Sequence, residues 1–448
     1  MDTIMSINSY VNNIVWGPPI LILIVGAGLF LSFKTGFFSI RKLGYILKNT
    51  LLKMFVKEQK GEGEVTAFQA VATALAATVG TGNIAGVATA IAAGGPGAIF
   101  WMWFAALLGM TTKFSEVVLA VNFREKTEDG RYVGGPMYYI KNGLGWNWLA
   151  VIFAVFGALA AFGIGNMVQS NSVAAALQAS FNLSPWITGL VLAVVTALVI
   201  VGGIKRIGAF TEKLVPFMAA FYIISGLIII LIHIAEIPAA FGLIFSSAFT
   251  GKAAVGGFAG ATMTQAIRFG IARGVFTNEA GLGSAPIAHA AATTDHPVRQ
   301  GLWGVFEVFM DTIVICSITA LAIITSGVWS DGLTGSALTT AAFDATLPGG
   351  GYIVSIGIVL FAFSTIIGWE YYGEKCFEYL LGPKSIMFYR IAWVPFVLIG
   401  AIGGLEFVWS LADTLNGLMA IPNLIGVLAL SGTVFKLTKE FFAKEKIK

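Results

Sequence analysis

The residues with the clearest chemical potential lie between Thr73 and Gly86, where glycines and polar side chains interrupt an apolar run about the length of a membrane span. Glycine costs about 1 kcal/mol relative to alanine inside a helix, so Gly80 and Gly82 predict a helix break. In lipid, such a break is tolerable only where protein or a water-filled cavity satisfies the freed backbone groups. Freed N–H groups suit a carboxylate, and freed carbonyls suit an ammonium group or Na⁺. An amino acid zwitterion would use both.

A second interruption follows at residues 272–286, ARGVFTNEAGLGSAP, which ends at a proline. Here Phe276 offers an aromatic wall, and Thr277, Asn278 and Glu279 offer polar groups. Each interruption also has a simpler interpretation. The first would serve close helix packing through small residues, and the second would be a re-entrant turn that binds nothing.

Three further positions place polar or aromatic groups inside apolar spans. Gln169 lies in a polar patch that could bind substrate or simply hydrogen-bond a neighbouring helix. Ser364 and Thr365 could serve a site, although hydroxyl groups inside a helix also bond their own backbone. Trp369 follows one turn later and would wall a small pocket.

Ionisable residues inside apolar spans are costly in hydrocarbon, so each is a candidate for function or for pairing. Both signs are present, and we expect ion pairs at most of these positions. They are Lys113, Glu116, Arg268, Arg273, Glu279, Glu307, Asp311, Glu370, Glu374 and Asp413. An enzymatic pair such as Ser284 and His289 is disfavoured, because residues five apart on a helix face different directions. No enzyme activity is expected.

The composition requires a membrane protein with many spans. Of 448 residues, 57% are hydrophobic and 11% are charged, and the mean hydropathy is +0.84. Ordinary soluble domains carry roughly 25% charged residues. The two cysteines lie in apolar runs and indicate neither a disulfide framework nor a metal site. No feature indicates a nucleic-acid partner.

The apolar runs predict an all-α fold of eleven spans. They cover residues 16–33, 65–92, 97–121, 147–179, 185–203, 212–234, 257–294 with an interruption, 300–326, 352–381, 386–403 and 406–435. Residues 1–13 are expected to be a short polar lead, and the basic stretch 34–60 a surface helix. Most lysines and arginines then fall on one side of the membrane, which the positive-inside rule makes cytoplasmic. The N-terminus would lie outside and the C-terminus in the cytoplasm.

The two interruptions fall five spans apart, so they run in opposite directions. This is the arrangement of an inverted five-plus-five repeat with its site at mid-membrane. The expected organisation is an extra span and cytoplasmic amphipathic helix at 1–63, repeats at 64–235 and 236–435, and a basic cytoplasmic tail at 436–448.

Four motifs carry a family resemblance: TVGTGN at 78–83, GIGNMVQSNS at 163–172, GVFTNEAGLGSAP at 274–286 and STIIGWEYYGEK at 364–375. Together they resemble the alanine or glycine:cation symporter family, within the amino acid, polyamine and organocation superfamily. That resemblance implies the leucine-transporter type of fold, a location in the plasma membrane and Na⁺-driven uptake of alanine and glycine. Sodium would be the coupling ion, with no other cofactor.

The resemblance also implies a division of roles among the site residues. Substrate contacts would come from Thr78, Gly80, Thr81, Gly82, Gln169, Phe276, Thr277, Asn278, Thr365 and Trp369. One cation site would use the Thr78 carbonyl, Asn83 and Thr277. A second would use the Ala76 and Val79 carbonyls with Ser364 and Thr365. Glu116 would brace the second break. The ligand that the helix after that break contributes to the first site is open between Asp311 and Glu307.

The residues therefore predict a secondary transporter that works by alternating access. A passive channel is one alternative, although it should show a polar stripe through several spans rather than two breaks that meet at mid-depth. An H⁺-coupled amino acid transporter is the other.

Overall fold

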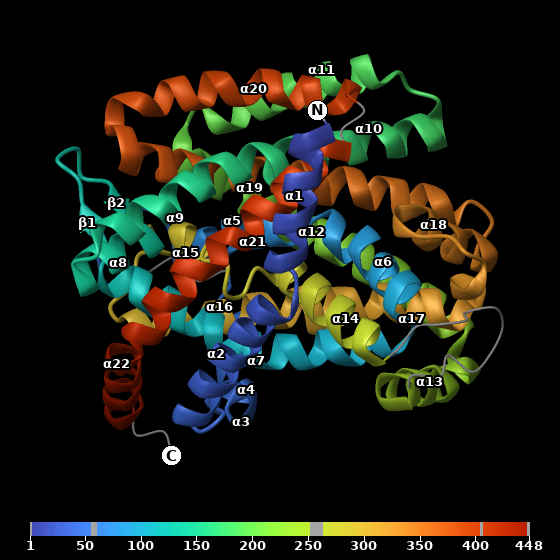
Figure 1. The fold of residues 1–448 in the computed structure, drawn as a ribbon, viewed down its shortest axis with the longest axis horizontal. Helices are drawn as coiled ribbons and strands as arrows, with labels where there is room; N and C mark the ends of the chain where they lie inside the picture. The colour runs from blue at the N-terminus through green and yellow to red at the C-terminus, as the bar shows by residue number, and fades with distance from the viewer. Residues whose placement is uncertain (1, 55–60, 251–262, 404–405, 446–448) are drawn as a thin grey trace.

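The computed structural model describes residues 2–54, 61–250, 263–403 and 406–445. Figure 1 shows an almost wholly helical molecule, with one short hairpin of strands β1 (Glu125–Lys126) and β2 (Tyr132–Val133). The helices are α1 (Asp2–Val15), α2 (Pro18–Lys34), α3 (Phe38–Arg41), α4 (Leu43–Asn49), α5 (Ala67–Thr78), α6 (Ala85–Gly94), α7 (Gly97–Asn122), α8 (Pro136–Leu144), α9 (Asn147–Ala160), α10 (Val168–Phe181), α11 (Pro185–Ile200), α12 (Gly203–Ile232), α13 (Ile237–Thr250), α14 (Met263–Asn278), α15 (Pro286–His289), α16 (Pro297–Val308), α17 (Ser317–Ser326), α18 (Gly335–Thr346), α19 (Gly350–Leu381), α20 (Ile386–Ile402), α21 (Glu406–Ala429) and α22 (Ser431–Lys444).

Within the described residues, eight helical stretches are long and apolar enough to cross a membrane. Four shorter apolar helices, at 67–78, 85–94, 185–200 and 234–250, accompany them. These stretches define a multi-pass membrane protein. The count of eleven spans stays a prediction.

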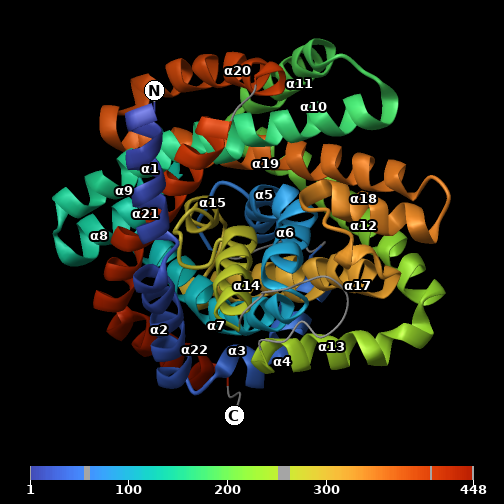
Figure 2. The same ribbon diagram turned by 45° about the vertical axis from the view of Figure 1, so that its right-hand side comes forward.

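Both expected interruptions are present as breaks between helices. The first separates α5 from α6 and contains the short turn η2 (Thr81–Asn83). The second separates α14 from α15 at residues 279–285. Figure 2 places all four helices near the centre of the molecule, and α14 packs against both α6 and α7. The start of the predicted interrupted span, residues 257–262, lies outside the described residues.

Several elements differ from what the apolar runs predicted. Residues 1–13 were expected to be a polar lead, but Asp2–Val15 form helix α1. Helix α18 also appears where no element was expected, because its mixed small and polar residues give no apolar run. The predicted span 406–435 ends at Ala429, and residues 431–444 continue as a separate helix, α22.

Two of the long spans contain a π-helical segment that no pattern in the sequence indicated. They are η3 (Ala161–Met167), between α9 and α10, and η5 (Phe309–Cys316), between α16 and α17. A π-helical turn loosens the regular hydrogen-bond ladder, and such turns often lie at functional sites. The candidate residue Gln169 lies just after η3, and Asp311 lies within η5.

The additional N-terminal helix α1 is attached to α21 by polar contacts. Asn8 donates a hydrogen bond to Ser410 at 2.7 Å, and Asn12 donates to Thr414 at 3.0 Å. The indole of Trp16 donates to the Asp413 carbonyl at 3.0 Å. These bonds fix how α21 is rotated about its own axis.

Close approach of α14 to α7 depends on Gly270. A Cβ atom there would lie 2.3 Å from the Ala98 carbonyl oxygen and 2.7 Å from the Trp101 Cβ. We therefore expect Gly270→Ala to lower the thermal stability in detergent by about 1–3 kcal/mol, the usual cost of overpacking. The control is Gly242→Ala on α13, where no heavy atom lies within 4 Å. Equal melting temperatures for the two variants would contradict this packing.

Candidate functional site

The first break is held open by the side chain of Asn83. The Gly80 N–H donates to Asn83 Oδ1 at 2.9 Å. In an unbroken helix this N–H would donate to the carbonyl of Ala76, four residues earlier. The Asn83 bond therefore releases the Ala76 carbonyl, while η2 and α6 start again at Thr81 with N–H groups that have no helical partner.

The second break is held by side chains from three other helices. Glu279 adopts a left-handed backbone conformation with φ +56°, which ends α14. The Gly281 N–H then donates to Glu116 on α7 at 3.1 Å. On α21, Asn423 donates to the same Glu116 oxygen and, at 2.8 Å, to the Gly281 carbonyl. The Tyr139 hydroxyl donates in turn to Asn423.

A small cavity of about 20 Å³ lies between the two breaks. Nine of the ten residues expected to contact substrate line it: Thr78, Gly80, Thr81, Gly82, Gln169, Phe276, Thr277, Thr365 and Trp369. The tenth, Asn278, does not line it, because its amide caps the break. Asn278 Oδ1 accepts the Ala280 N–H at 3.0 Å, and its Nδ2 donates to Thr312.

Four residues line the cavity that the sequence did not indicate as contacts: Ala77, Ile164, Glu279 and Asn416. Glu279 is held in place by the Trp369 indole, which donates to its Oε1 at 2.8 Å, and by Ser284, which donates to its Oε2 at 2.6 Å. The apolar span 406–435 carried no break or motif that would have indicated Asn416.

A wide vestibule of about 690 Å³ leads to one side of this cavity. The two spaces share Thr81, Gly82, Ile164 and Phe276 as lining residues. The rest of the vestibule is lined by α1, α6, α10, α14, α18, α19 and α21. These four residues therefore form the boundary that the vestibule and the cavity have in common.

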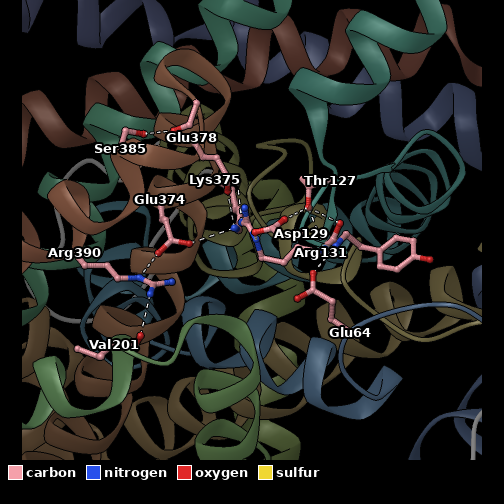
Figure 3. A network of polar contacts seen from close by, with 12 residues as sticks. Glu64, Thr127, Asp129, Arg131, Val201, Glu374, Lys375, Glu378, Ser385 and Arg390 are labelled. Carbon is pink, nitrogen blue, oxygen red and sulfur yellow. Dashed lines mark hydrogen bonds and ion pairs between the residues drawn. The ribbon is translucent and has the colours of Figure 1, made fainter.

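The C-terminal end of α19, away from the vestibule, takes part in a network of ion pairs (Figure 3). Arg131 pairs with Glu378 at 2.9 Å, and Arg390 pairs with Glu374 at 2.5 Å. Lys375 bridges both carboxylates, at 3.3 Å from Glu374 and 2.7 Å from Glu378. These pairs join the hairpin to α19, and α19 to α20.

The hairpin loop that joins this network carries a firmly ionised carboxylate. Asp129 accepts a hydrogen bond from Arg131 at 2.7 Å and another from Thr127. These bonds lower the pKa of Asp129 to about 2. The Arg131 guanidinium therefore has an anionic neighbour, Asp129, at any physiological pH. This pairing orients the guanidinium toward Glu378.

The residues expected at the second cation site lie beside one another across α5 and α19. The Ser364 and Thr365 hydroxyls both donate to the Phe361 carbonyl, at 2.8 and 3.0 Å. A Cβ added to Gly80 would lie 2.6 Å from the Thr365 hydroxyl oxygen, so the break passes directly against α19. Each hydroxyl oxygen keeps a lone pair, and carbonyl and hydroxyl oxygens are ligands that hard cations prefer.

At the expected first cation site, Asp311 rather than Glu307 is the carboxylate that meets Asn83. Asn83 Nδ2 donates to Asp311 Oδ1 at 2.5 Å, and Thr312 donates to Asp311 Oδ2 at 2.7 Å. The Thr277 hydroxyl lies within hydrogen-bonding reach of the same carboxylate. The segment η5 thus places the Asp311 carboxylate beside Asn83 at the expected first cation site.

Glu307 instead forms the centre of a buried polar cluster behind the first break. Lys113 lies 3.2 Å from Glu307 Oε1, and His289 lies 3.1 Å from Oε2. The Thr78 hydroxyl also donates to Oε1, at 2.8 Å. Lys113, His289 and Glu307 are fully buried, so this cluster neutralises its charge internally.

The fold matches that of a solved membrane protein, MhsT in complex with L-phenylalanine. The TM-score is 0.57 over 82% of this chain and 89% of that chain, at 14% sequence identity. This is the fold of leucine-transporter-type proteins. With two broken helices around a small central cavity, the chain has the architecture of a helical membrane transporter.

Sequence comparison gives the family. The chain matches the sodium:alanine symporter family over residues 1–448. It is 55% identical to the sodium/alanine symporter AgcS of Methanococcus maripaludis over 449 residues, covering 98% of each chain. An uncharacterized transporter of Haemophilus influenzae is 48% identical, covering 99% of this chain and 98% of its own. The chain therefore belongs to the sodium:alanine symporter family, whose members are transporters and not enzymes.

The cluster around Glu307 makes a prediction about stability. Lys113→Met leaves a buried carboxylate without its cation, which typically costs about 3–5 kcal/mol. We expect a strong loss of melting temperature in detergent. The double variant Lys113→Met with Glu307→Gln removes both charges but keeps a single acceptor oxygen for Thr78 and His289, so it should recover part of the loss. A double variant no more stable than the single one would contradict the pairing.

Proposed function

We propose that the chain is a Na⁺-coupled symporter of small neutral amino acids, alanine and glycine, that works by alternating access. The observation that carries the proposal is the cavity between the two breaks. It combines N–H groups at a helix start, released carbonyl groups and little space. The sodium/alanine name of the AgcS relative supports the same substrate.

The size of the cavity favours the smallest amino acids. At about 20 Å³ it has space for little more than one water-sized group between the Phe276 and Trp369 rings. A larger side chain would clash with these walls rather than simply lose contacts. Even glycine has five heavy atoms, so the cavity must widen to take a substrate, and it must widen least for glycine and alanine.

Coupling to a cation follows from charge. A substrate carboxylate at the N–H groups of η2 adds a negative charge to a protein interior that already holds Asp311 close by. A cation bound among carbonyl, hydroxyl and carboxylate oxygens would neutralise that charge. Substrate and Na⁺ therefore strengthen each other's binding, and the coupling is reciprocal.

The transport cycle depends on opening and closing the two ends of the path that runs through the central cavity. The vestibule leads into the cavity, and the ion-pair network of Arg131, Lys375 and Arg390 closes the opposite end. By the positive-inside rule the network lies on the cytoplasmic side, with eleven spans and an external N-terminus. Breaking these pairs would open the path inward, while Arg273 and Asp413, which both line the vestibule, would approach each other outside.

Purified protein in proteoliposomes tests the function. Radiolabelled alanine should accumulate only when a Na⁺ gradient is imposed, and unlabelled glycine should compete. Accumulation driven by an H⁺ gradient alone would favour the H⁺-coupled alternative. Single-channel current without saturable, Na⁺-dependent uptake would favour a passive channel, and either result would overturn Na⁺ symport.

Phe276 should set the size limit, because its ring separates the vestibule from the cavity. We expect Phe276→Ala to let valine and leucine compete with alanine uptake, which they should not do in the unmodified protein. Trp409→Ala is the matched control, since Trp409 lines the vestibule but not the cavity. Unchanged selectivity in Phe276→Ala, measured by competition in proteoliposomes, would contradict this role.

A further inference from the structure

One helix not expected to contact substrate, α21, follows the transport path along its length. Asp413 lines the vestibule, Asn416 lines the central cavity, and Asn423 holds the second break. The spacings of three and seven residues put all three on one face of the helix. A buried polar stripe on a membrane helix needs a partner at each position. Asp413 and Asn423 have theirs within the protein.

Asn416 does not. Its side chain is 1% exposed, and neither its Oδ1 nor its Nδ2 has a hydrogen-bond partner among the described residues. Buried polar groups are almost always bonded, and each exception calls for an explanation. Because Asn416 lines a cavity between two helix breaks, a bound ligand is the partner that fits its position.

The hydrogen bonds of the other lining groups narrow the choice of ligand group. The Thr78 hydroxyl donates to Glu307, and the Thr277 and Thr365 hydroxyls donate to backbone carbonyls. Both Glu279 oxygens accept a hydrogen bond. Among the described lining residues, the buried side-chain atoms without a partner are Gln169 Oε1 and the two Asn416 atoms. The unused capacity of the cavity thus lies in two amides on opposite helices, α10 and α21.

The orientation of the Gln169 amide follows from the π-helical segment. Its Nε2 donates to the Ile164 carbonyl at 2.9 Å, and Ile164 lies in η3. A carbonyl can only accept, so Gln169 must direct Nε2 toward it and Oε1 toward the cavity. A Cβ on Gly80 would lie 3.6 Å from this oxygen. Gln169 therefore presents an acceptor at the first break.

We propose that Asn416 is a direct substrate contact, and that its Oδ1 accepts from the substrate ammonium group together with Gln169 Oε1. The proposal rests on the function proposed above and adds a residue to its site. An ammonium group has three N–H donors and no acceptor, so two amide oxygens and one released carbonyl would satisfy it. The carboxylate end is then left to the N–H groups of η2.

The position of Asn416 is fixed from outside the cavity. Trp16 and Asn12 hold α21 through Asp413 and Thr414, less than one turn from Asn416. Because α1 sets the rotation of α21, the additional N-terminal helix positions a binding group in the central cavity. This gives that helix a role in substrate recognition in addition to packing.

Asn416→Leu separates a ligand contact from a structural one. Replacing an unpartnered buried amide by an apolar side chain of similar shape should leave the substrate-free protein as stable or more stable. We expect the substrate-free melting temperature to be maintained or raised, and the alanine affinity at saturating Na⁺ to fall about tenfold or more. Both quantities are measured on the full chain in detergent, by thermal melting and by calorimetric titration with alanine.

Two further variants sharpen the result. Asn416→Asp keeps the acceptor and loses the N–H donor, so its alanine affinity should stay within about threefold of the unmodified protein. Tyr222→Phe on α12 is the matched control, because it removes a buried hydrogen bond to Thr319 without touching the cavity. This control should lower the melting temperature and leave the alanine affinity unchanged.

Three outcomes would overturn the proposal. Unmodified alanine affinity in Asn416→Leu would exclude a substrate contact. A substrate-free melting temperature that falls in Asn416→Leu as it does in Tyr222→Phe would show a structural role. Equal loss of affinity in the Asp and Leu variants would show that the amide N–H, not the oxygen, is needed. Failure of the unmodified protein to bind alanine would instead count against the proposed function, and the titration shows this first.

Discussion

The structure depends on satisfying the backbone groups that two helix breaks expose inside an apolar molecule. Water cannot reach most of these groups, and an unpaired buried N–H or C=O costs as much as a lost hydrogen bond. The protein supplies partners from side chains: Asn83 for the Gly80 N–H, Glu116 for the Gly281 N–H and Asn423 for the Gly281 carbonyl. The central cavity lies between the two breaks that these bonds hold, which makes it the candidate binding site.

Helix α7 places the two breaks relative to each other. Lys113 and Glu116 lie three residues apart and therefore on one face of α7. Lys113 neutralises Glu307, which in turn accepts from Thr78 beside the first break, while Glu116 holds the second break directly. A single rigid helix thus contacts both broken ones through buried charges. If one break moved relative to the other, the contacts of Lys113 and Glu116 on α7 would be strained. The two breaks are therefore expected to move together, as one unit of the transporter.

Much of the fold was predictable because membrane spans can be recognised from the length and hydropathy of apolar runs. Glycine and polar residues within an apolar run indicated both breaks, at 78–83 and 276–284. Hydropathy did not indicate α18, whose residues are small and mixed, or α1, whose polar asparagines bond α21 rather than water. The π-helical turns were also hidden, since they depend on how a helix packs against its neighbours and not on a local signal.

The sequence by itself determined which residue types stand at the breaks, and through them six of the residues that line the cavity. Three more, Gln169, Thr365 and Trp369, were indicated by polar or aromatic groups inside other spans. It could do so because glycine and polar groups are expensive in a membrane helix and stay only where they have a use. Only the tertiary structure decided the partners. Asn278 and Glu279 are adjacent in the chain, yet the first caps a helix end and the second lines the cavity. Asn416 comes to the cavity from a distant helix, because a hydrogen bond depends on distance in space, which the order of residues does not contain.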